Sequence, residues 1–380
     1  HEGLADESGF PLPSLTKKYL QLAKGGIGAI ITGYSGVSPE GRCSYHGMLM
    51  INSKESIPAY SALVQAVHNL DTPIILQLGH AGRQTRSKIT GFQPVAPSAI
   101  RDRFFNEEIP RELSEKEIEG VITAFVEAAV RAKAAGFDGI QLHAAHGYLL
   151  AEFLSPYMNR RKDRWGGNTQ NRFRIIGEIF EQIRAKLPGF PVLVKINGTD
   201  GRKNGMRIPE AVAIARLLES AGCAAIEVSC GVDEDGFFSI RSERNPVDAV
   251  FHYNFKVQNA PAWIRPLLKF FLKRTFEPKL PSRLYNIPAA RAVKAAVSIP
   301  VITVGGIKTL PELRSVFENN DADLVSLSRP LILEPNLIEK FISGKQTEAK
   351  CIGCNYCALG IESASLRCHF GKLKNPRDLE

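Results

Sequence analysis

Short apolar runs rich in β-branched residues alternate with amphipathic stretches along most of this chain. In SEKEIEGVITAFVEAAVRAKAAG (114–136) and NRFRIIGEIFEQIRAKL (171–187), the apolar residues recur at helical spacing. Ser114 with Glu117 predicts a capping box at the start of the first stretch, and Gly136 predicts its end. Strands that are apolar on both faces and alternate with helices are typical of a parallel sheet covered by helices. With this many repeats, we expect a (β/α)8 barrel rather than an open doubly wound sheet.

Seven strands can be counted, one fewer than a closed barrel of this kind needs. They are predicted at IGAIIT (27–32), PIILQL (73–78), GIQLH (139–143), PVLVKIN (191–197), AAIEVS (224–229), IPVITV (299–304) and ADLVSLS (322–328). A further helix is predicted at PEAVAIARLLESAG (209–222). Because the chain begins with a histidine, we expect the first strand to lie upstream of His1. The segment HEGLADESGFPLPS (1–14) would then be the loop that follows it.

Two regions depart from the regular alternation. Residues 233–285 form an insertion between the sixth and seventh barrel strands, longer than an ordinary connection. Within it, AWIRPLLKFFLKRTF (262–276) is both basic and apolar, which suits a lid or a membrane-surface helix. We favour the simpler interpretation, an amphipathic helix packed on the barrel. Residues 336–380 follow the last strand, so the expected division is a barrel over 1–335 and a cysteine-rich extension over 336–380.

The composition restricts the class of protein. Hydrophobic residues make up 44% and charged residues 23%, as in ordinary soluble globular proteins. No apolar run reaches the ~18–20 residues of a membrane helix and no secretory leader is visible, so we expect a cytoplasmic protein without a transmembrane segment. The net charge of +9 suits anionic ligands, but the basic residues are spread out and no nucleic-acid motif occurs.

Four of the seven cysteines crowd into the last tenth of the chain, namely Cys351, Cys354, Cys357 and Cys368. This crowding favours metal ligation in a reducing compartment over an extracellular disulfide framework. The other three cysteines are scattered, which is typical of small buried side chains.

In a barrel, the carboxyl ends of the strands and the loops after them form the active site. This rule selects Gln77, His143, His146, Tyr148, Lys195, Gly305, Gly306, Ser328 and Arg329. The glycine pair after the seventh strand and Ser328-Arg329 after the eighth predict a phosphate site, since barrels commonly bind phosphate at these loops. An arginine there adds a bidentate donor. A tight turn and a helix cap are the structural alternatives.

The local pattern leaves the chemistry of two features open. Lys195 is either a Schiff-base nucleophile or a fixed cation beside an electron-rich cofactor. His143 and His146 could ligate one metal ion, although no third ligand is evident nearby. Alternatively their ring N–H groups hold a carbonyl oxygen, with Tyr148 as a proton donor on the other side. In the third interpretation, the histidines only bond to the backbone.

The stretch HAAHGYLLAEFLSPYMNRRKDRWGG (143–167), with ILQLGHAGR (75–83), VITVGGI (301–307) and SLSRPLI (326–332), resembles the Old Yellow Enzyme family of FMN-dependent NAD(P)H:flavin oxidoreductases. The similarity extends from GLADESGF near the start to about residue 335. It implies an FMN-binding (β/α)8 barrel, in which GLADESGF matches the segment just after the first strand.

The resemblance also assigns roles. It implies that His143 and His146 hold the activating carbonyl of a substrate above the flavin. Tyr148 would protonate the α-carbon as hydride from flavin N5 arrives at the β-carbon. Gln77 would contact the pyrimidine edge of the flavin. Lys195 takes the place of a basic residue near flavin N1, so the Schiff-base interpretation loses support.

At the phosphate end, Gly305 and Gly306 fit the family's phosphate loop. Ser328 and Arg329 match a pair that is usually Gly-Arg; the serine departs from that pattern but keeps a backbone donor. The resemblance therefore implies a phosphate-binding role for all four residues.

The tail resembles a second pattern. Cys351-x2-Cys354-x2-Cys357-x10-Cys368 is similar to the cysteines of the 2,4-dienoyl-CoA reductase branch, which hold a 4Fe–4S cluster. That branch usually has one more residue between its second and third cysteines. Its members also carry flavin- and NAD(P)H-binding domains that feed the cluster, whereas this sequence stops at Glu380. A cluster here would need an electron-transfer partner protein; zinc and free thiols are the alternatives.

The resulting prediction is an oxidoreductase in which NAD(P)H reduces FMN and an activated alkene then accepts hydride. The alkene would be a small-molecule enone, enoate or enoyl thioester. The alternatives are an FMN-dependent amine dehydrogenase or demethylase of the same family, a metal- or lysine-dependent aldolase or lyase barrel, and a non-catalytic binding subunit. A homo-oligomer is left open.

Overall fold

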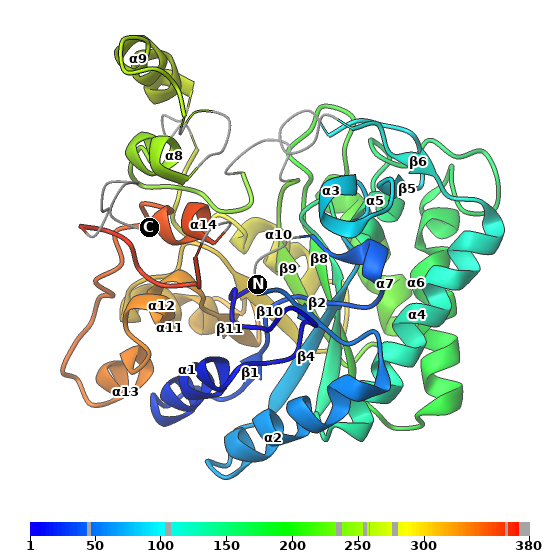
Figure 1. Ribbon diagram of the computed structural model, residues 1–380. Helices are drawn as coiled ribbons and strands as arrows, with labels where there is room; N and C mark the ends of the chain where they lie inside the picture. The colour runs from blue at the N-terminus through cyan, green and yellow to red at the C-terminus, as the bar shows by residue number, and fades with distance from the viewer. Residues whose placement is uncertain are drawn as a thin grey trace.

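A curved parallel sheet forms the centre of the molecule, and helices cover its outer face (Figure 1). The computed structural model describes residues 1–43, 47–102, 108–232, 238–253, 257, 259–275, 280–361 and 364–371. The strands of the main sheet are β1 (Ile30–Ile31), β2 (Ser35–Gly36), β3 (Leu49–Met50), β4 (Ile74–Gly79), β7 (Gly139–Ala144), β8 (Val192–Asn197), β9 (Ala225–Ser229), β10 (Val301–Val304) and β11 (Leu324–Ser326). A separate short pair consists of β5 (Val95–Ala96) and β6 (Arg111–Glu112).

From β4 to β11 each strand of the main sheet lies beside the one before it in the chain, as in the wall of a barrel. On its other side, β4 pairs with β1 at its beginning and with β2 at its end. The seven predicted strands are therefore confirmed, within three residues at each end. Among the described residues, no pairing joins β11 to β1 or β2.

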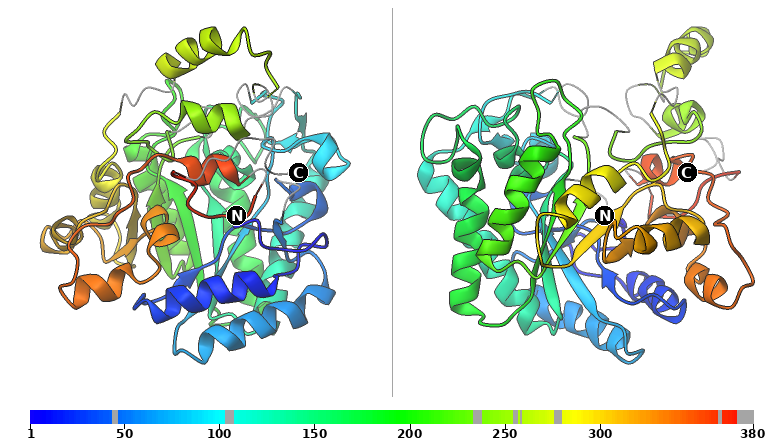
Figure 2. Two further views of the ribbon diagram at one scale, coloured as in Figure 1. Left: turned by 60° about the vertical axis from the view of Figure 1, so that its left-hand side comes forward. Right: turned by 180° about the vertical axis from the view of Figure 1, so that it is seen from behind.

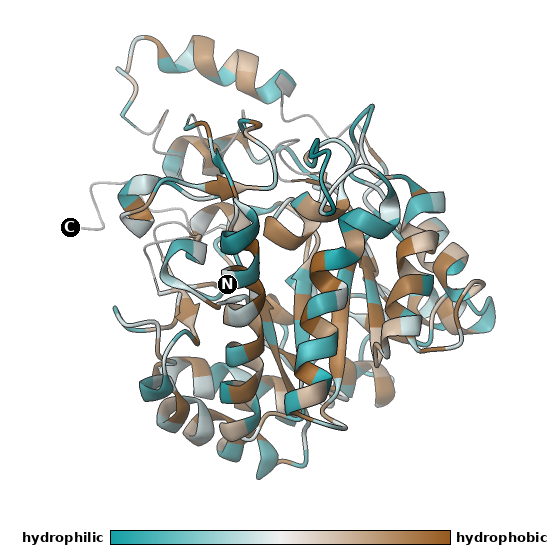
Figure 3. Ribbon diagram, turned by 90° about the vertical axis from the view of Figure 1, so that its right-hand side faces the viewer, coloured by the Kyte–Doolittle hydropathy of each residue, from teal (hydrophilic) through white to brown (hydrophobic). Residues whose placement is uncertain are grey.

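Two kinds of α-helix accompany the sheet. Those of the first two-thirds of the chain are α1 (Pro13–Lys24), α2 (Ile57–His68), α3 (Ser87–Thr90), α4 (Glu115–Ala134), α5 (Leu149–Leu154), α6 (Thr169–Lys186), α7 (Ile208–Ala221) and α8 (Val247–Tyr253). The later ones are α9 (Arg265–Thr275), α10 (Ile287–Lys294), α11 (Leu310–Glu318), α12 (Arg329–Leu333), α13 (Leu337–Ile342) and α14 (Tyr356–Gly360). Short 3-10 turns lie at Pro39–Gly41 and Lys54–Ser56. The helices around the sheet turn apolar side chains toward the strands and polar ones outward (Figure 3).

The beginning of α4 forms as its sequence predicts. The Ser114 side chain accepts from the Glu117 N–H and the Glu117 carboxylate accepts from the Ser114 N–H, which completes the capping box. Gly136 has a φ of 93°, a conformation that favours glycine, and the chain leaves the helix there. The three predicted barrel helices correspond to α4, α6 and α7.

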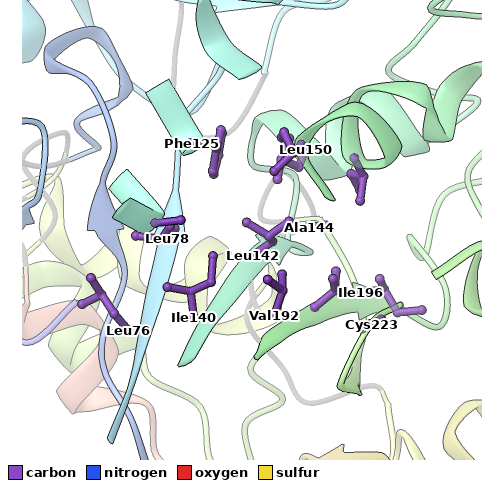
Figure 4. Packing of buried hydrophobic residues seen from close by; sticks show 14 of the residues in the cluster. Leu76, Leu78, Phe125, Ile140, Leu142, Ala144, Leu150, Val192, Ile196 and Cys223 are labelled. Atoms are coloured by element: carbon purple, nitrogen blue, oxygen red, sulfur yellow. The ribbon is translucent and has the colours of Figure 1, made fainter. Parts of the chain in front are cut away.

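The main hydrophobic core lies between the sheet and these helices. Leu76, Ile140, Leu142 and Ile196 face outward from the strands and are fully buried against helical side chains such as Phe125 (Figure 4). Since successive strand residues point to opposite faces, their neighbours point into the barrel. The outer apolar layer thus fixes which residues line the interior.

The helix α9 departs from its prediction. It packs against α8, and Figures 1 and 2 place it away from the sheet. Its aromatic side chains are exposed, with Trp263 at 80% and Phe270 at 66%. Packing of this helix on the barrel was therefore the wrong expectation. Parts of the 233–285 insertion, namely residues 233–237, 254–256, 258 and 276–279, lie outside the described residues.

The tail returns to the start of the chain. The Leu366 N–H donates to the Glu2 carbonyl at 2.7 Å, and Lys18 Nζ donates to the Leu366 carbonyl at 2.8 Å. Residues 362–363 and 372–380 of the predicted extension lie outside the described part. In the described part of the chain, no helix combines the length and apolarity that crossing a membrane requires.

Candidate functional site

The barrel interior is layered along the strand direction. Its floor is an apolar cluster of Ile75, Leu193, Ala225 and Ile302. Two residues further along the strands comes a polar layer made of Gln77, Gln141, Lys195 and Glu227. The histidine, tyrosine and phosphate-loop candidates follow at the carboxyl ends of the strands. The interior therefore becomes polar toward the end at which barrels place their active sites.

Three predicted residues and one further tyrosine form a ring cluster at this end. The ring centroids of His143 and His146 are 5.1 Å apart, and those of His143 and Tyr148 are 4.9 Å apart. Tyr34 packs against His143 at 6.0 Å and against Tyr148 at 5.1 Å. The structure thus brings the HxxHxY residues together around one point.

Both histidines are neutral in the folded protein. Burial, with the neighbouring His146 and Lys195, holds the pKa of His143 well below its usual value. Burial and Lys195 lower the pKa of His146 to about 3. Each neutral imidazole carries one N–H donor, as the carbonyl-clamp interpretation requires.

The His146 side chain is held firmly. Its Nε2 shares a hydrogen bond of 2.7 Å with Ser229 Oγ, which leaves Nδ1 for a ligand. Its backbone N–H donates to Asn197 Oδ1 at 3.1 Å, and Gln84 Nε2 donates to its carbonyl at 3.0 Å. These bonds hold a left-handed backbone, with φ of 63°, that an L-residue adopts only at a cost of ~1–2 kcal/mol.

The residues after the HxxHxY motif support this arrangement from behind. Ser155 Oγ donates to Asp200 Oδ2 at 2.6 Å, and Asn197 Nδ2 donates to Asp200 Oδ1 at 3.0 Å. Asn197 is in turn the acceptor of the His146 backbone N–H. The FLSP segment of the long motif therefore has a structural task, which is to position the loop that carries His146.

The metal-site interpretation of the histidine pair gains no support. His143 Nδ1 is buried, and no described residue bonds to it. The described residues contain no group of three or more His, Cys, Asp or Glu side chains arranged to hold a metal ion. A ligand with an acceptor oxygen fits the orphaned imidazole nitrogen better than an ion that needs further ligands.

Lys195 and Gln77 belong to one buried network. Lys195 Nζ lies 3.2 Å from Glu227 Oε1, and Gln141 Nε2 donates to Glu227 Oε2 at 2.8 Å. Gln77 Nε2 donates to Gln141 Oε1 at 2.6 Å. The ion pair favours a charged lysine, which suits a fixed cation and disfavours a Schiff-base nucleophile.

The glycine pair adopts backbone conformations reserved for glycine, with φ of 112° at Gly305 and 74° at Gly306. A Cβ at Gly305 would lie 2.6 Å from the Tyr285 ring, and one at Gly306 would lie 2.3 Å from the Ser282 carbonyl oxygen. Close packing against residues 282–285 thus already requires both glycines. A phosphate-binding role stays a prediction.

Ser328 precedes the short helix α12, in which Arg329 is the first residue. Arg329 Nη1 donates to the Arg241 carbonyl at 2.8 Å and to Asn355 Oδ1 at 2.6 Å. No other described group accepts from this guanidinium, so its Nε and Nη2 edge remains for an anion such as phosphate.

The tail cysteines gather near one another. Cys354 is buried, and Cys351, Cys357 and Cys368 are partly buried; none forms a disulfide. Burial raises the pKa of Cys357 to about 11, with Arg329 opposing and the charges of Cys351 and Cys354 adding to the rise. Cys354 in turn feels Cys368 and Cys351. The four thiols therefore lie within electrostatic reach, although not as a single-ion site.

Five further residues of the site were missed from the sequence. Tyr34, Asn197 and Ser229 end or follow barrel strands, so the strand-end rule could have selected them. Gln141 and Glu227 lie inside the barrel, where a polar residue in an apolar strand was the only signal. Their partners come from other strands and could not be known from local pattern.

Comparison with known proteins places these features in a family. A model described as the NADH:flavin oxidoreductase / NADH oxidase family matches residues 5–231. The chain is 34% identical over 372 residues to an NADH oxidase of Thermoanaerobacter brockii, across 96% of this chain and 51% of the relative. It is 33% identical over 319 residues to an NADPH dehydrogenase of Geobacillus thermodenitrificans, across 83% of this chain and 79% of the relative.

A solved structure supports the fold. The old yellow enzyme homologue from Zymomonas mobilis superposes with a TM-score of 0.72 at 23% identity, covering 99% of this chain and 93% of that one. This likeness confirms the (β/α)8 barrel architecture. The chain spans about half the length of the NADH oxidase that it matches. By the extent of the family match, this chain belongs to the NADH:flavin oxidoreductase / NADH oxidase family, and its predicted kinship with the Old Yellow Enzyme group is confirmed.

Proposed function

We propose that this chain is the FMN-binding barrel of an NAD(P)H-dependent oxidoreductase that reduces an activated alkene. The observation that carries the proposal is the cluster of His143, His146 and Tyr148, two neutral imidazoles beside a phenol at the polar end of the barrel. Relatives named NADH oxidase and NADPH dehydrogenase support NAD(P)H as the reductant.

The residues present suit a flavin. The Gln77 amide and the Lys195 ammonium offer an acceptor and donors for the pyrimidine side, and the open edge of Arg329 offers donors for the phosphate. Gly305, Gly306 and Ser328 would supply backbone N–H groups beside Arg329. Bound FMN supplies hydride chemistry that amino-acid side chains lack.

The protein's own task is to polarise the substrate and deliver a proton. His143 and His146 each donate an N–H to a carbonyl oxygen conjugated to the alkene, and these bonds strengthen as negative charge develops there. Tyr148 holds the proton for the α-carbon. The polarised carbonyl explains why the proposed substrates are enones, enoates or enoyl thioesters rather than simple alkenes. The Lys195–Glu227 ion pair gives the lysine-dependent aldolase alternative no support.

The tail forms a separate part of the proposal. We propose that Cys351, Cys354, Cys357 and Cys368 hold a 4Fe–4S cluster and that an electron-transfer partner protein serves it. A cluster spaces its thiolates further apart than one ion does, which suits thiols that sense one another's charge without forming a single-ion site. The absence of disulfides among the seven cysteines supports a cytoplasmic location.

Flavin and metal content test both parts. Protein purified without oxygen should be yellow, and acid extraction should release about one FMN per chain. Iron and acid-labile sulfide should be present in equal amounts. A colourless yet active protein would end the flavin proposal, and zinc without iron would end the cluster proposal.

A further inference from the structure

The polar layer of the barrel interior is a chain of hydrogen bonds that crosses four strands. It runs from Lys195 on β8 to Glu227 on β9, then to Gln141 on β7 and to Gln77 on β4. Gln141 is fully buried, Glu227 is 2% exposed and Gln77 is 8% exposed. Buried polar groups of this kind need partners of the correct polarity, because an unmade bond costs ~1–3 kcal/mol.

The polarity of every bond in this chain follows from one end. Glu227 faces the Lys195 ammonium at 3.2 Å, so its carboxylate is ionised and can only accept. Gln141 must therefore turn its NH2 group toward Glu227, at 2.8 Å, and its carbonyl toward Gln77. Gln77 then has to donate its own NH2 group to that carbonyl, at 2.6 Å. Each amide has two different ends, so no step can be reversed without a mismatch.

One acceptor is left over at the exposed end of the chain. With its NH2 group directed at Gln141, the Gln77 side chain retains its carbonyl oxygen Oε1 for a ligand. The pyrimidine ring of a flavin carries one N–H, between two carbonyls, and otherwise only acceptors. An oxygen at Gln77 matches that N–H, and the Lys195 ammonium matches the acceptors.

We propose that Glu227, acting through Gln141, orients the Gln77 amide so that Oε1 accepts from the ring N–H of the flavin. Glu227 and Gln141 are positioning residues, since they act through Gln77 and Lys195. The proposal rests on the proposed FMN site and adds the residues that decide how that site recognises its cofactor.

The direct test removes the middle of the chain. Q141L keeps the size of the side chain, leaves the Lys195–Glu227 pair in place and lets the Gln77 amide turn over. We expect FMN to bind about tenfold more weakly, since one hydrogen bond contributes ~1 kcal/mol and 1.4 kcal/mol is a factor of ten. Affinity is measured by quenching of FMN fluorescence in apoprotein, with thermal unfolding as a check on the fold.

A flavin analogue reports the polarity itself. FMN methylated on the ring N–H lacks the donor that Gln77 Oε1 should receive, so wild-type protein should prefer FMN to this analogue. In Q141L the preference should shrink, because FMN loses its bond and the analogue has none to lose. The control Q65L removes an exposed amide that bonds to Asn69 Oδ1, and both affinities should stay at the wild-type level.

A second variant covers the case in which Q141L does not fold. E227Q preserves shape but lets Gln141 present either end, so the preference for FMN over the methylated analogue should again shrink. Unlike Q141L, it also leaves Lys195 without a counter-charge, so the flavin reduction potential should rise in E227Q and stay near wild type in Q141L.

The outcomes separate the two levels of the account. If wild-type protein binds neither flavin, the FMN site and the orientation chain both fall. If wild type prefers FMN and both variants keep that preference unchanged, the FMN site stands and the orientation chain is overturned.

Discussion

Arg329 donates a hydrogen bond to the side-chain oxygen of Asn355 at 2.6 Å. Arg329 follows the last barrel strand, and Asn355 lies within the cysteine segment between Cys354 and Tyr356. Asn355 is 1% exposed, and its Nδ2 donates to the Ile240 carbonyl at 2.5 Å. One side chain thus ties the tail to the insertion and to the residue proposed to hold the cofactor phosphate.

Replacing this asparagine should weaken both the fold and the cofactor site. N355A removes both side-chain bonds, and we expect a loss of ~1–3 kcal/mol in unfolding free energy, with weaker FMN binding because Arg329 loses a restraint. Asn355 also has a left-handed backbone, with φ of 60°. N320A is a matched control, since Asn320 has φ of 52° but is exposed. Equal losses in the two variants, in urea unfolding, would reduce the effect to backbone strain.

Tyr148 should be needed for only one half of the reaction. Y148F keeps the ring that packs against His143 and Tyr34 but removes the proton. We expect reduction of the flavin by NAD(P)H to be unchanged and reduction of the alkene to slow by ~10²–10⁴-fold. Rapid-mixing absorbance measurements resolve the two steps. Equal loss in both would remove the proton-donor role.

Ser229 should matter through His146. S229A leaves His146 Nε2 without its 2.7 Å partner, so the ring loses its fixed orientation. We expect phenolic ligands to bind about tenfold more weakly, while H146A should weaken them further because the donor itself is absent. Spectral titration of the bound flavin measures both. An S229A affinity equal to wild type would show that Ser229 does not orient the ring.

Glu152 should make the fold less stable as the pH rises. Burial raises its pKa to about 8 from an ordinary 4.5, with Arg83 opposing and Asp102 adding to the rise. Between these values the folded protein keeps a proton that the unfolded chain has lost, so stability falls by up to ~1.4 kcal/mol per pH unit. E152Q should flatten this decline in urea unfolding between about pH 5 and about pH 8. E318Q, which removes an exposed carboxylate, should follow wild type; a parallel E152Q profile would refute the assignment.

Local pattern was sufficient for the parts of the fold that depend on local physics. The alternation of strands and helices, and the Ser114 capping box, follow from spacing within a few residues. The helix α9 shows the limit of this approach. Its apolar stripe indicated that something should cover Trp263 and Phe270, but a stripe carries no information on which surface does so.

The site divides in the same way. The strand-end rule brought His143, His146 and Tyr148 to the same place, because parallel strands end together. The chain from Gln77 to Glu227 could not be found in this way. Gln141 and Glu227 are 86 residues apart, and their contact depends on the register between strands that the sequence does not state.

Anaerobic stopped-flow absorbance of the purified protein tests the central claim most directly. We predict that NADH or NADPH bleaches the flavin band, and that an enone, enoate or enoyl-CoA ester then restores it with formation of the saturated product. A flavin that is reduced but is not reoxidised by any of these alkenes would contradict alkene reduction, and a protein that reduces them without any flavin would contradict the whole account.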